Sequence, residues 1–407
     1  MREMKDSGIE WIGEIPREWE VIKLKYFATI QSGLSIDKQN YEENGLYSIV
    51  GANGVVGKFS SFNNTRPCLT TGRVGTLGTV HKVDKAWVTD NALMIYENDT
   101  IHQDYLKYVI PYFDFNEMTS GTAMPLITAT KLYNQYIPYF SLPEQRRIAD
   151  FLDRKCAEID AVIEKTKAAV EEYKKLKQSV ITEAVTKGVR GPRPMKPSGV
   201  EWIGDVPEGW EKSKIKYISY FSPTCATDDL TPESEVTYTP MECIHNGYFD
   251  NQKSTFSKFS NSYTLYQEGD IVLAKVTPCF ENGNISVMTN LYSNIGFGSS
   301  ELFVLRPNGI ETKYLFYYLQ NDIFKKMACS TMTGTGGLKR VSPAFIENYF
   351  IPIPDKSEQQ EISDYLDRKC AGIDNILAKK QQFIKELEAY KKSLIYEYVT
   401  GKKEVKS

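Results

Sequence analysis

The chain has few residues of the kinds that build disulfide frameworks and metal centres. Its 407 residues include seven cysteines, an odd number without C-x-x-C spacing, and only three histidines. We therefore expect neither a disulfide framework nor a metal site. No apolar run is long enough to span a bilayer, and the first residues lack the apolar region of a signal peptide. These absences predict a cytoplasmic protein without a membrane partner.

Excess positive charge, which is typical of nucleic-acid-binding proteins, is also missing. Lys and Arg number 49 against 52 Asp and Glu, a formal net charge of -3. Any contact with nucleic acid must therefore depend on locally clustered cations or on the charge of a partner. The sequence has no nucleophile elbow, no H-E-x-x-H pattern and no helicase phosphate loop. We predict no catalytic residues, and an enzyme with an unrecognised site remains an alternative.

What the sequence does contain is an internal duplication. The phrase SGIEWIGEIP at 7–16 returns as SGVEWIGDVP at 198–207, and LDRKCA at 152–157 returns at 366–371. Between these shared phrases the two halves differ. A repeat of this length, in a chain too long for one ordinary core, predicts two domains built on one plan.

Heptad patterns predict two long amphipathic helices, at 141–188 and 355–401. Ser141 with Glu144, and Asp355 with Glu358, have the spacing of a capping box, and a glycine follows each helix. We expect the two helices to pack together as an antiparallel coiled coil. The residues predicted to pack are, in the first helix, Ile148, Leu152, Ile159, Val162, Ala169, Tyr173, Leu176 and Val180, and in the second, Ile362, Leu366, Ile373, Ile376, Phe383, Leu387, Tyr390 and Leu394.

The variable segments share a skeleton. Apolar runs at 92–95 and 302–305 predict strands, and each is followed by a helix-like segment. The predicted fold class is mixed α+β: two globular α/β domains separated by two long antiparallel helices, in a pseudo-twofold tandem repeat. The predicted segments are a first domain at 1–140, the first helix at 141–188, a linker at 189–197, a second domain at 198–354, the second helix at 355–401 and a tail at 402–407.

Glycine-rich stretches in the first domain are candidates for DNA contact. In 72–78, glycines would let the backbone approach a ligand closely, while Arg73 between Thr71 and Thr76 could reach a guanine edge or a phosphate. The stretch 51–58, with Asn53 and Lys58, resembles a phosphate loop but lacks the required glycine and hydroxyl residue, so it predicts a hairpin. An ordinary solvated turn is the alternative for both stretches.

Corresponding candidates occur in the second domain. Lys275 occupies the stretch that matches Arg73, and polar residues follow it. Further along the chain, Lys339 and Arg340 end a flexible glycine-rich loop, and two cations at the end of such a loop suit contact with phosphates. A plain surface loop is again the alternative. The candidate DNA-binding residues of this domain are Lys275, Thr277, Asn282, Thr335, Lys339 and Arg340.

Four of the five tryptophans lie in the repeated phrases or just after them. Trp11 and Trp202 are at one repeated position, and Trp19 and Trp210 are at another. Aromatic side chains can stack on bases, but identical copies cannot read different sequences. We therefore predict that these residues pack against the ends of the long helices.

These motifs together resemble the specificity subunit of Type I restriction-modification systems, over essentially the whole chain. The resemblance rests on Leu142-Pro143-Glu144-Gln145 with Ile148 and Leu152-Asp153, on its second copy from Glu358-Gln359, and on the two Trp-Ile-Gly openings. The second copy has Ser357 in place of Pro143 and Ser363 in place of Ala149. Neither change disturbs the predicted helix.

The resemblance implies a non-catalytic subunit that reads double-stranded DNA. Each domain would read one half of an asymmetric bipartite site, and the helices would set the spacer. Two methylation subunits, joined by restriction subunits, would carry out the chemistry. S-adenosylmethionine, ATP and Mg would bind to these partners and none to this chain. The rival hypothesis is an adaptor whose duplicated helices assemble protein partners without reading DNA.

Overall fold

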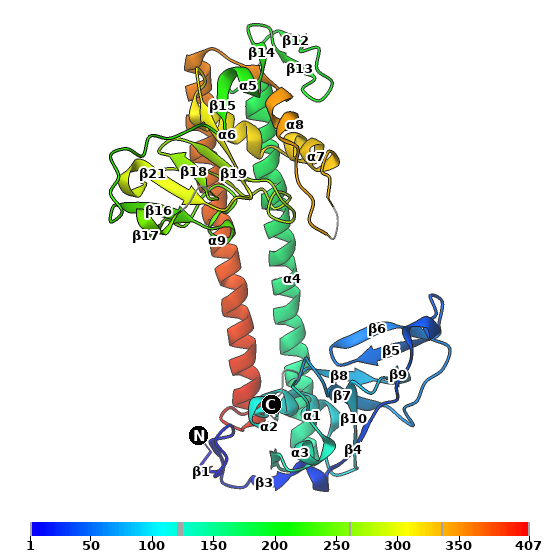
Figure 1. Cartoon of the computed structure of the whole chain (residues 1–407). Coiled ribbons are helices and arrows are strands. Elements are labelled where there is room, and N and C mark those ends of the chain that lie inside the picture. Colours follow the sequence, from blue (N-terminus) through cyan, green and yellow to red (C-terminus); the bar gives the residue numbers. More distant parts are fainter. Residues whose placement is uncertain (1, 120–124, 260–261, 335–336, 406–407) are drawn as a thin grey trace. The chain divides into compact units, whose positions relative to one another are not determined.

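The computed structural model describes residues 2–119, 125–259, 262–334 and 337–405 (Figure 1). It divides into two compact units: unit 1 comprises Met1–Lys167 with Gln382–Ser407, and unit 2 comprises Ala168–Gln381. Each unit combines one globular domain with parts of both long helices. The division therefore passes through the helices, because each part of a helix packs with the domain beside it. The six predicted segment boundaries stay a prediction.

Two long helices, α4 (Leu142–Lys187) and α9 (Lys356–Val399), confirm the predicted helical repeat. They are antiparallel in both units. In unit 1, Lys391 Nζ lies 2.6 Å from Asp160 Oδ2, and in unit 2, Lys177 Nζ lies 2.8 Å from Asp374 Oδ2. Both residues of one pair are repeated, at an offset of 214, in the other. The two helices therefore contact each other in the same way in each unit.

The ends of the helices are as predicted, but their starts differ. Gly188 and Gly401 have φ of +77° and +74°, the left-handed conformation with which glycine ends helices. At the start of α9, Asp355 Oδ1 accepts a hydrogen bond from the Glu358 amide at 2.8 Å. Among the described residues, Ser141 makes no such side-chain contact. The predicted capping box is wrong for α4 and half formed in α9, because Glu144 and Glu358 bind arginines instead.

The packing of the helices corrects part of the predicted seam. Leu152, Ile159, Leu366 and Ile373 are buried, and Leu387 is partly buried against the core of unit 1. Leu176, however, is 48% exposed. An α-helix with 3.6 residues per turn drifts by about 20° per heptad, so a strict seven-residue repeat rotates out of the contact. The other predicted seam residues that are exposed are Val162, Ile376, Phe383 and Tyr390.

Unit 1 is built around an antiparallel sheet with the strand order β4-β10-β7-β8. Alternate residues of β10 face two cores: Leu93 and Ile95 belong to the main core, and Met94 and Tyr96 to a smaller one. Burial on both faces explains the continuous apolar run. The strands are β4 (Ala28–Ser32), β7 (Cys68–Gly72), β8 (Val80–Val83) and β10 (Ala92–Glu97).

Smaller elements complete unit 1. The predicted hairpin is confirmed: β5 and β6 pair with Gly54 at φ +104°, and β9 runs parallel to β5. The remaining elements are short. Their bounds are β1 (Met4–Asp6), β2 (Glu14–Pro16), β3 (Glu20–Lys23), β5 (Tyr47–Gly51), β6 (Gly54–Phe59), β9 (Ala86–Val88), β11 (Tyr136–Tyr139), α1 (Gln103–Val109), α2 (Phe115–Met118) and α3 (Ala129–Tyr133).

Unit 2 repeats this topology. Its central antiparallel sheet has the order β15-β22-β19-β20, and Phe303 and Leu305 of β22 face the main core while Leu302 and Val304 face a smaller one. The strands are β15 (Ser219–Phe221), β19 (Ile271–Ala274), β20 (Ile285–Val287) and β22 (Leu302–Pro307).

A second sheet in unit 2 has the order β17-β16-β21-β18, with β16 and β21 parallel, like β5 and β9 of unit 1. Strand β18 is an addition to that plan. The remaining bounds are β12 (Met195–Pro197), β13 (Asp205–Pro207), β14 (Glu211–Lys214), β16 (Glu235–Thr239), β17 (Gln252–Thr255), β18 (Thr264–Gln267), β21 (Ile295–Gly298), β23 (Phe350–Ile353), α5 (Ile215–Ile218), α6 (Thr312–Gln320), α7 (Asp322–Ser330) and α8 (Pro343–Asn348).

The repeated tryptophans lie where each domain meets the end of a long helix. Trp19 is fully buried in the same core as Leu394 and Val399 of α9, and Trp210 is buried with Ile181 of α4. Trp11 stacks on Tyr112 with ring centroids 6.3 Å apart, and Trp202 packs on Tyr349 at 5.3 Å. The packing of Trp19 and Trp210 joins each domain to the helix that ends beside it, whereas the ring contacts of Trp11 and Trp202 lie within the domains.

Two tyrosines at matching positions tie each domain to the helices by hydrogen bonds. Tyr105 Oη contacts the carbonyl oxygens of Pro138 and Val399, both at 3.1 Å. Tyr314 Oη contacts those of Pro352 at 2.8 Å and Val185 at 3.3 Å. Burial in the core raises the pKa of both hydroxyls well above its usual value, so both stay protonated donors.

None of the helices within the described ranges is long and apolar enough to cross a membrane. In the same part of the chain, no group of three or more His, Cys, Asp or Glu side chains is arranged to hold a metal ion.

Candidate nucleic-acid interface

In unit 2, the predicted cations gather at one end of the central sheet. Lys275 follows the last residue of β19, and Glu301 directly precedes the neighbouring strand β22. The Lys275 amide donates to the Glu301 carbonyl at 3.1 Å, which extends the ladder by one residue. Arg340 reaches the same place from the loop before α8, with its Nη2 2.7 Å from Glu301 Oε1. Strand pairing thus brings together residues that are far apart in sequence.

Backbone hydrogen bonds fix the loop that carries Arg340. Arg340 and Thr333 exchange two amide-to-carbonyl bonds, of 2.8 and 3.1 Å, and the Val341 amide donates to the Lys275 carbonyl at 2.9 Å. Main-chain hydrogen bonds to Thr333 and to Lys275 therefore fix the backbone at Arg340 and at the residue after it.

Thr277 supports the same loop from within. Its hydroxyl donates to the Gly337 carbonyl at 3.0 Å and accepts from the Lys339 amide at 2.9 Å. Thr277 is only 9% exposed and its hydroxyl is taken up by the loop, so the structure gives it a role in positioning the loop, and its role as a DNA contact stays a prediction. Lys339 and Asn282 are exposed beside it. The remaining candidate, Thr335, lies outside the described residues.

The electrostatics of this cluster are set by Glu301. The hydrogen bonds that Arg340 donates to the Glu301 carboxylate lower the pKa of that carboxyl, while partial burial opposes the shift and Lys275 adds to it. The carboxylate is therefore ionised at neutral pH. Lys275 Nζ lies 4.0 Å from Glu301 Oε2 and 5.6 Å from the centre of the Phe303 ring. Lys275 is the least exposed of the three cations.

Unit 1 has a related site with fewer charges. The Arg73 amide donates to the Asn91 carbonyl at 2.8 Å, and the Ile127 amide donates to the Arg73 carbonyl at 2.9 Å, which matches the bonds of Lys275. The Arg73 guanidinium lies 3.3 Å from the Asp90 carbonyl oxygen. Leu126 occupies the place of Arg340, since it bridges to Val74 as Arg340 does to Val276.

The other candidates in unit 1 have different surroundings. Thr71 is 1% exposed within β7, because the sheet is covered on both faces, and its role as a DNA contact stays a prediction. Thr76 is exposed in the loop after Arg73. Asn53 and Lys58 are exposed on the β5–β6 hairpin. The structure brings Arg73 and Thr76 into one loop and leaves the hairpin residues on another element.

Two carbonyl or carboxylate groups at these sites were missed by sequence reasoning. Glu301 and Asp90 come just before the strands β22 and β10. The only signal in the sequence is their place just before a strand. That place does not indicate that a cation from another loop lies beside them. Glu301 becomes recognisable as part of the site once the contact with Arg340 is seen.

The two units share one topology and carry different cations at the same end of the central sheet, so they define a tandem protein with two unlike surfaces on a duplicated helical frame. A family model described as the Type I restriction modification DNA specificity domain matches residues 16–172 and 207–387. Since these segments make up most of the chain, the protein belongs to that family, as the sequence resemblance predicted.

Individual relatives agree with this membership. The chain is 34% identical over 192 residues to the Type I restriction enzyme EcoEI specificity subunit of Escherichia coli, a match that covers 46% of this chain and 31% of that protein. The match to the EcoAI specificity subunit covers 32% of its length. The first two relatives are thus matched over about a third of their length. The MjaVIII specificity subunit of Methanocaldococcus jannaschii is 25% identical over 430 residues, covering 97% of this chain and 95% of that protein.

One solved structure has the same fold. It is a chain from work described as the structural basis underlying complex assembly and conformational transition of the type I R-M system. The TM-score is 0.68 at 18% identity, and the match covers 95% of this chain and 98% of the other. The predicted mixed α+β class with a tandem repeat and two long helices is confirmed.

Proposed function

We propose that this chain is the DNA sequence-recognition subunit of a Type I restriction-modification complex. Each globular domain would read one half of an asymmetric bipartite site. The observation that carries this proposal is the contrast between the two sites: the same sheet end presents Arg73 in unit 1 and Lys275, Lys339 and Arg340 in unit 2. Two domains of the same fold that present different hydrogen-bond donors suit two different half-sites, because a protein reads base identity from the pattern of donors and acceptors.

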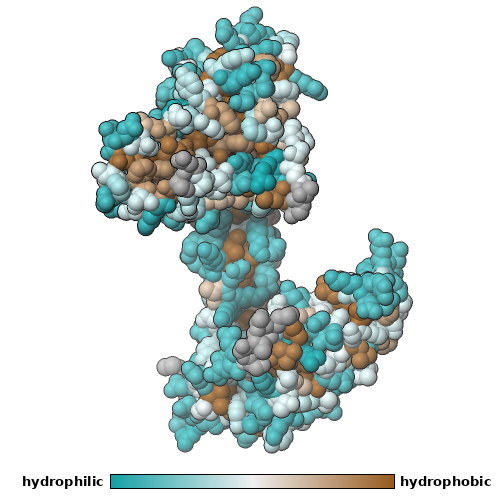
Figure 2. All heavy atoms as spheres, in the orientation of Figure 1, coloured by the Kyte–Doolittle hydropathy of each residue, from teal (hydrophilic) through white to brown (hydrophobic). Residues whose placement is uncertain are grey.

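The helices support a second part of the proposal, the docking of two methylation subunits. Unit 1 exposes Val162 and Tyr390, and unit 2 exposes Ile376 and Leu176 at the positions that correspond to them after an offset of 214. Unit 1 also exposes Phe383, which lies on the same helix as Tyr390. Figure 2 shows hydrophobic atoms among hydrophilic ones where the helices are uncovered. An apolar stripe repeated in both units suits two copies of one partner, because equivalent surfaces bind equivalent partners.

The chemistry of the complex would belong to those partners. In this proposal the chain binds no cofactor itself and is not an enzyme. The methylation subunits would use S-adenosylmethionine to methylate adenines, and restriction subunits would use ATP and Mg to translocate and cleave double-stranded DNA. A near-neutral chain with a net charge of -3 fits this division of labour, since the partners can supply further contacts to phosphates.

Selection from random DNA tests the proposal against the adaptor alternative. The chain would be purified with its methylation subunits and mixed with a library of random duplexes, and the bound fraction would be sequenced. A recognition subunit enriches one bipartite motif with a fixed spacer. An adaptor binds the methylation subunits equally well and enriches none.

A further inference from the structure

The contact between Arg340 and Glu301 has the geometry of a guanidinium fork fixed by a carboxylate. Arg340 Nε lies 3.1 Å from Glu301 Oε2, and Arg340 Nη2 lies 2.7 Å from Glu301 Oε1. The pair is therefore bidentate, the arrangement in which an arginine is most strongly oriented. Among the residues that the structure describes, Nη1 and the second hydrogen of Nη2 have no hydrogen-bond partner, and they lie along the outer edge of the guanidinium, away from the carboxylate.

Both members of the pair are held by backbone that is already fixed. Glu301 directly precedes β22, and its amide donates to Ser299 Oγ at 3.2 Å while its carbonyl accepts from the Lys275 amide. Arg340 is anchored by its exchange of hydrogen bonds with Thr333. The side chains are nonetheless accessible, with 47% of Arg340 and 31% of Glu301 exposed. A preorganised, exposed donor pair loses little conformational entropy when it binds.

The carboxylate also decides what kind of acceptor the fork would take. A phosphate placed against Arg340 would approach Glu301, and two anions at such a distance repel each other. A base edge carries no net charge and avoids that repulsion. Two parallel N–H donors match the O6 and N7 acceptors of guanine in the major groove.

We infer that Arg340 reads a guanine in the half-site of unit 2, and that Glu301 is a positioning residue that sets this specificity. The inference rests on the proposed function. Unit 1 has Leu126 in the place of Arg340, so the half-site of unit 1 does not depend on this pair. The same molecule thereby provides an internal control.

The test repeats the library selection with variants of unit 2 in the complex with methylation subunits. Glu301→Gln removes the charge that orients the guanidinium, and Arg340→Lys removes the fork but keeps the charge. We expect the wild-type motif to contain an invariant G·C pair in one half. Each variant should lower discrimination at that pair by about 5- to 150-fold, the range for a lost bidentate contact. The other half of the motif should not change, which also shows that the variant complex is folded.

A matched control is Glu235→Gln, which breaks an exposed pair with Lys253 elsewhere in unit 2. It should leave every position of the motif unchanged. The inference is overturned if Arg340→Lys leaves discrimination at that pair unchanged, or if Glu301→Gln strengthens binding to all sequences equally, because a cation that holds a phosphate beside a carboxylate behaves in that way. A wild-type complex that selects no motif would instead overturn the proposed function itself.

Discussion

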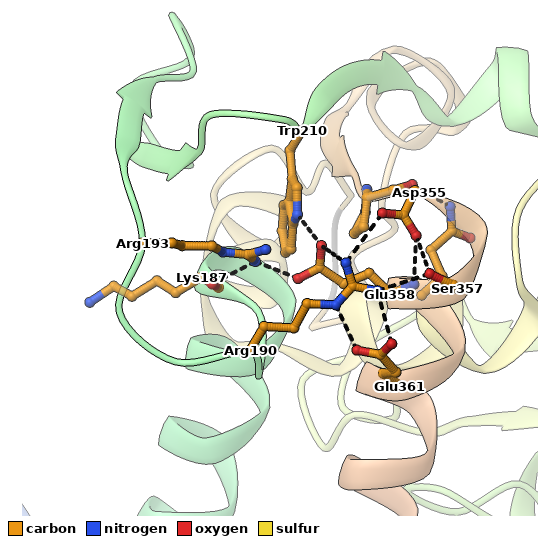
Figure 3. A network of polar contacts seen from close by, with 10 residues as sticks. Lys187, Arg190, Arg193, Trp210, Asp355, Ser357, Glu358 and Glu361 are labelled. Atoms are coloured by element: carbon orange, nitrogen blue, oxygen red, sulfur yellow. Dashed lines mark hydrogen bonds and ion pairs between the residues drawn. The ribbon is translucent and has the colours of Figure 1, made fainter.

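The indole Nε1 of Trp210 donates a hydrogen bond to Oε2 of Glu358 at 2.9 Å. The Glu358 side chain is only 2% exposed, and its other oxygen binds the guanidinium of Arg193 (Figure 3). Arg190 of the linker extends this network to Glu361, at 2.7 Å and 2.8 Å. The network joins the linker, the second tryptophan motif and the start of α9 in unit 2.

Removal of the arginine from this network should destabilise unit 2. In Arg193→Met, the buried Glu358 carboxylate loses its closest cation, and we expect the free energy of unfolding to fall by up to about 3 kcal/mol. Urea unfolding followed by circular dichroism measures the change. Arg17→Met is the control, since Arg17 and Glu3 are both mostly exposed and such pairs contribute at most about 1 kcal/mol. Equal losses in the two variants would contradict the assigned role of burial.

The hydroxyl of Tyr314 should stabilise the junction between unit 2 and its helix segments. Tyr314→Phe leaves the carbonyl groups of Pro352 and Val185 without this donor, at a cost of about 1 to 2 kcal/mol. Tyr217→Phe is the matched control, because Tyr217 is 70% exposed. Thermal unfolding of both variants checks the prediction, and an unchanged midpoint for Tyr314→Phe would refute it.

The exposed stripe should be needed for assembly and not for folding. Phe383→Asp places a charge on a side chain that is 45% exposed, so the unfolding of the chain alone should change little. Binding of the methylation subunit should weaken at least tenfold, because an apolar contact is replaced by a buried charge. Gln381→Asp is the matched control, because it adds the same charge at an exposed neighbouring position. Calorimetric titration of both variants decides, and equal affinities would exclude the stripe as the docking surface.

The cations at the two sheet ends should act on different half-sites. We expect Arg73→Ala and Lys275→Ala each to weaken DNA binding by about 1 to 3 kcal/mol if they read bases. Arg73→Ala should relax positions in one half of the motif, and Lys275→Ala positions in the other. Competition binding with DNA altered in one half at a time measures this, and a single variant that affects both halves would contradict the assignment of one domain to each half.

The cap of α9 predicts a dependence on pH. The pKa of Asp355 is lowered from its ordinary value of 3.8, first by the hydrogen bond from Ser357 and then by that from the Glu358 amide. A lowered pKa means that the ionised carboxylate stabilises the fold above about pH 3.8, and that this contribution is lost as the pH falls through the lower folded value. The stability difference between the wild type and Asp355→Ala should be constant from about pH 7 to 5 and narrow below about pH 4. Urea unfolding across this range tests it.

Much of the frame could be predicted because its signals are local. The periodicity around Leu152 and Leu366 gave both helices, and the glycines at 188 and 401 gave their ends, because helix formation depends on near neighbours. The exposure of Leu176 could not be predicted in the same way, since it depends on how two helices drift against each other.

The candidate site also has features that the sequence determines and features that depend on tertiary contacts. The duplication and the presence of cations near Arg73 and Lys275 were determined by the sequence, because a repeat and a charge are properties of the chain itself. Only the tertiary structure decided that Thr71 is buried, that Thr277 supports a loop, and that Arg340 meets Glu301. Backbone hydrogen bonds of Lys275 with Glu301 and with Val341 bring Arg340 and Glu301 together, although these two residues are 39 positions apart in the sequence. No local sequence pattern encodes which side chains meet in this way.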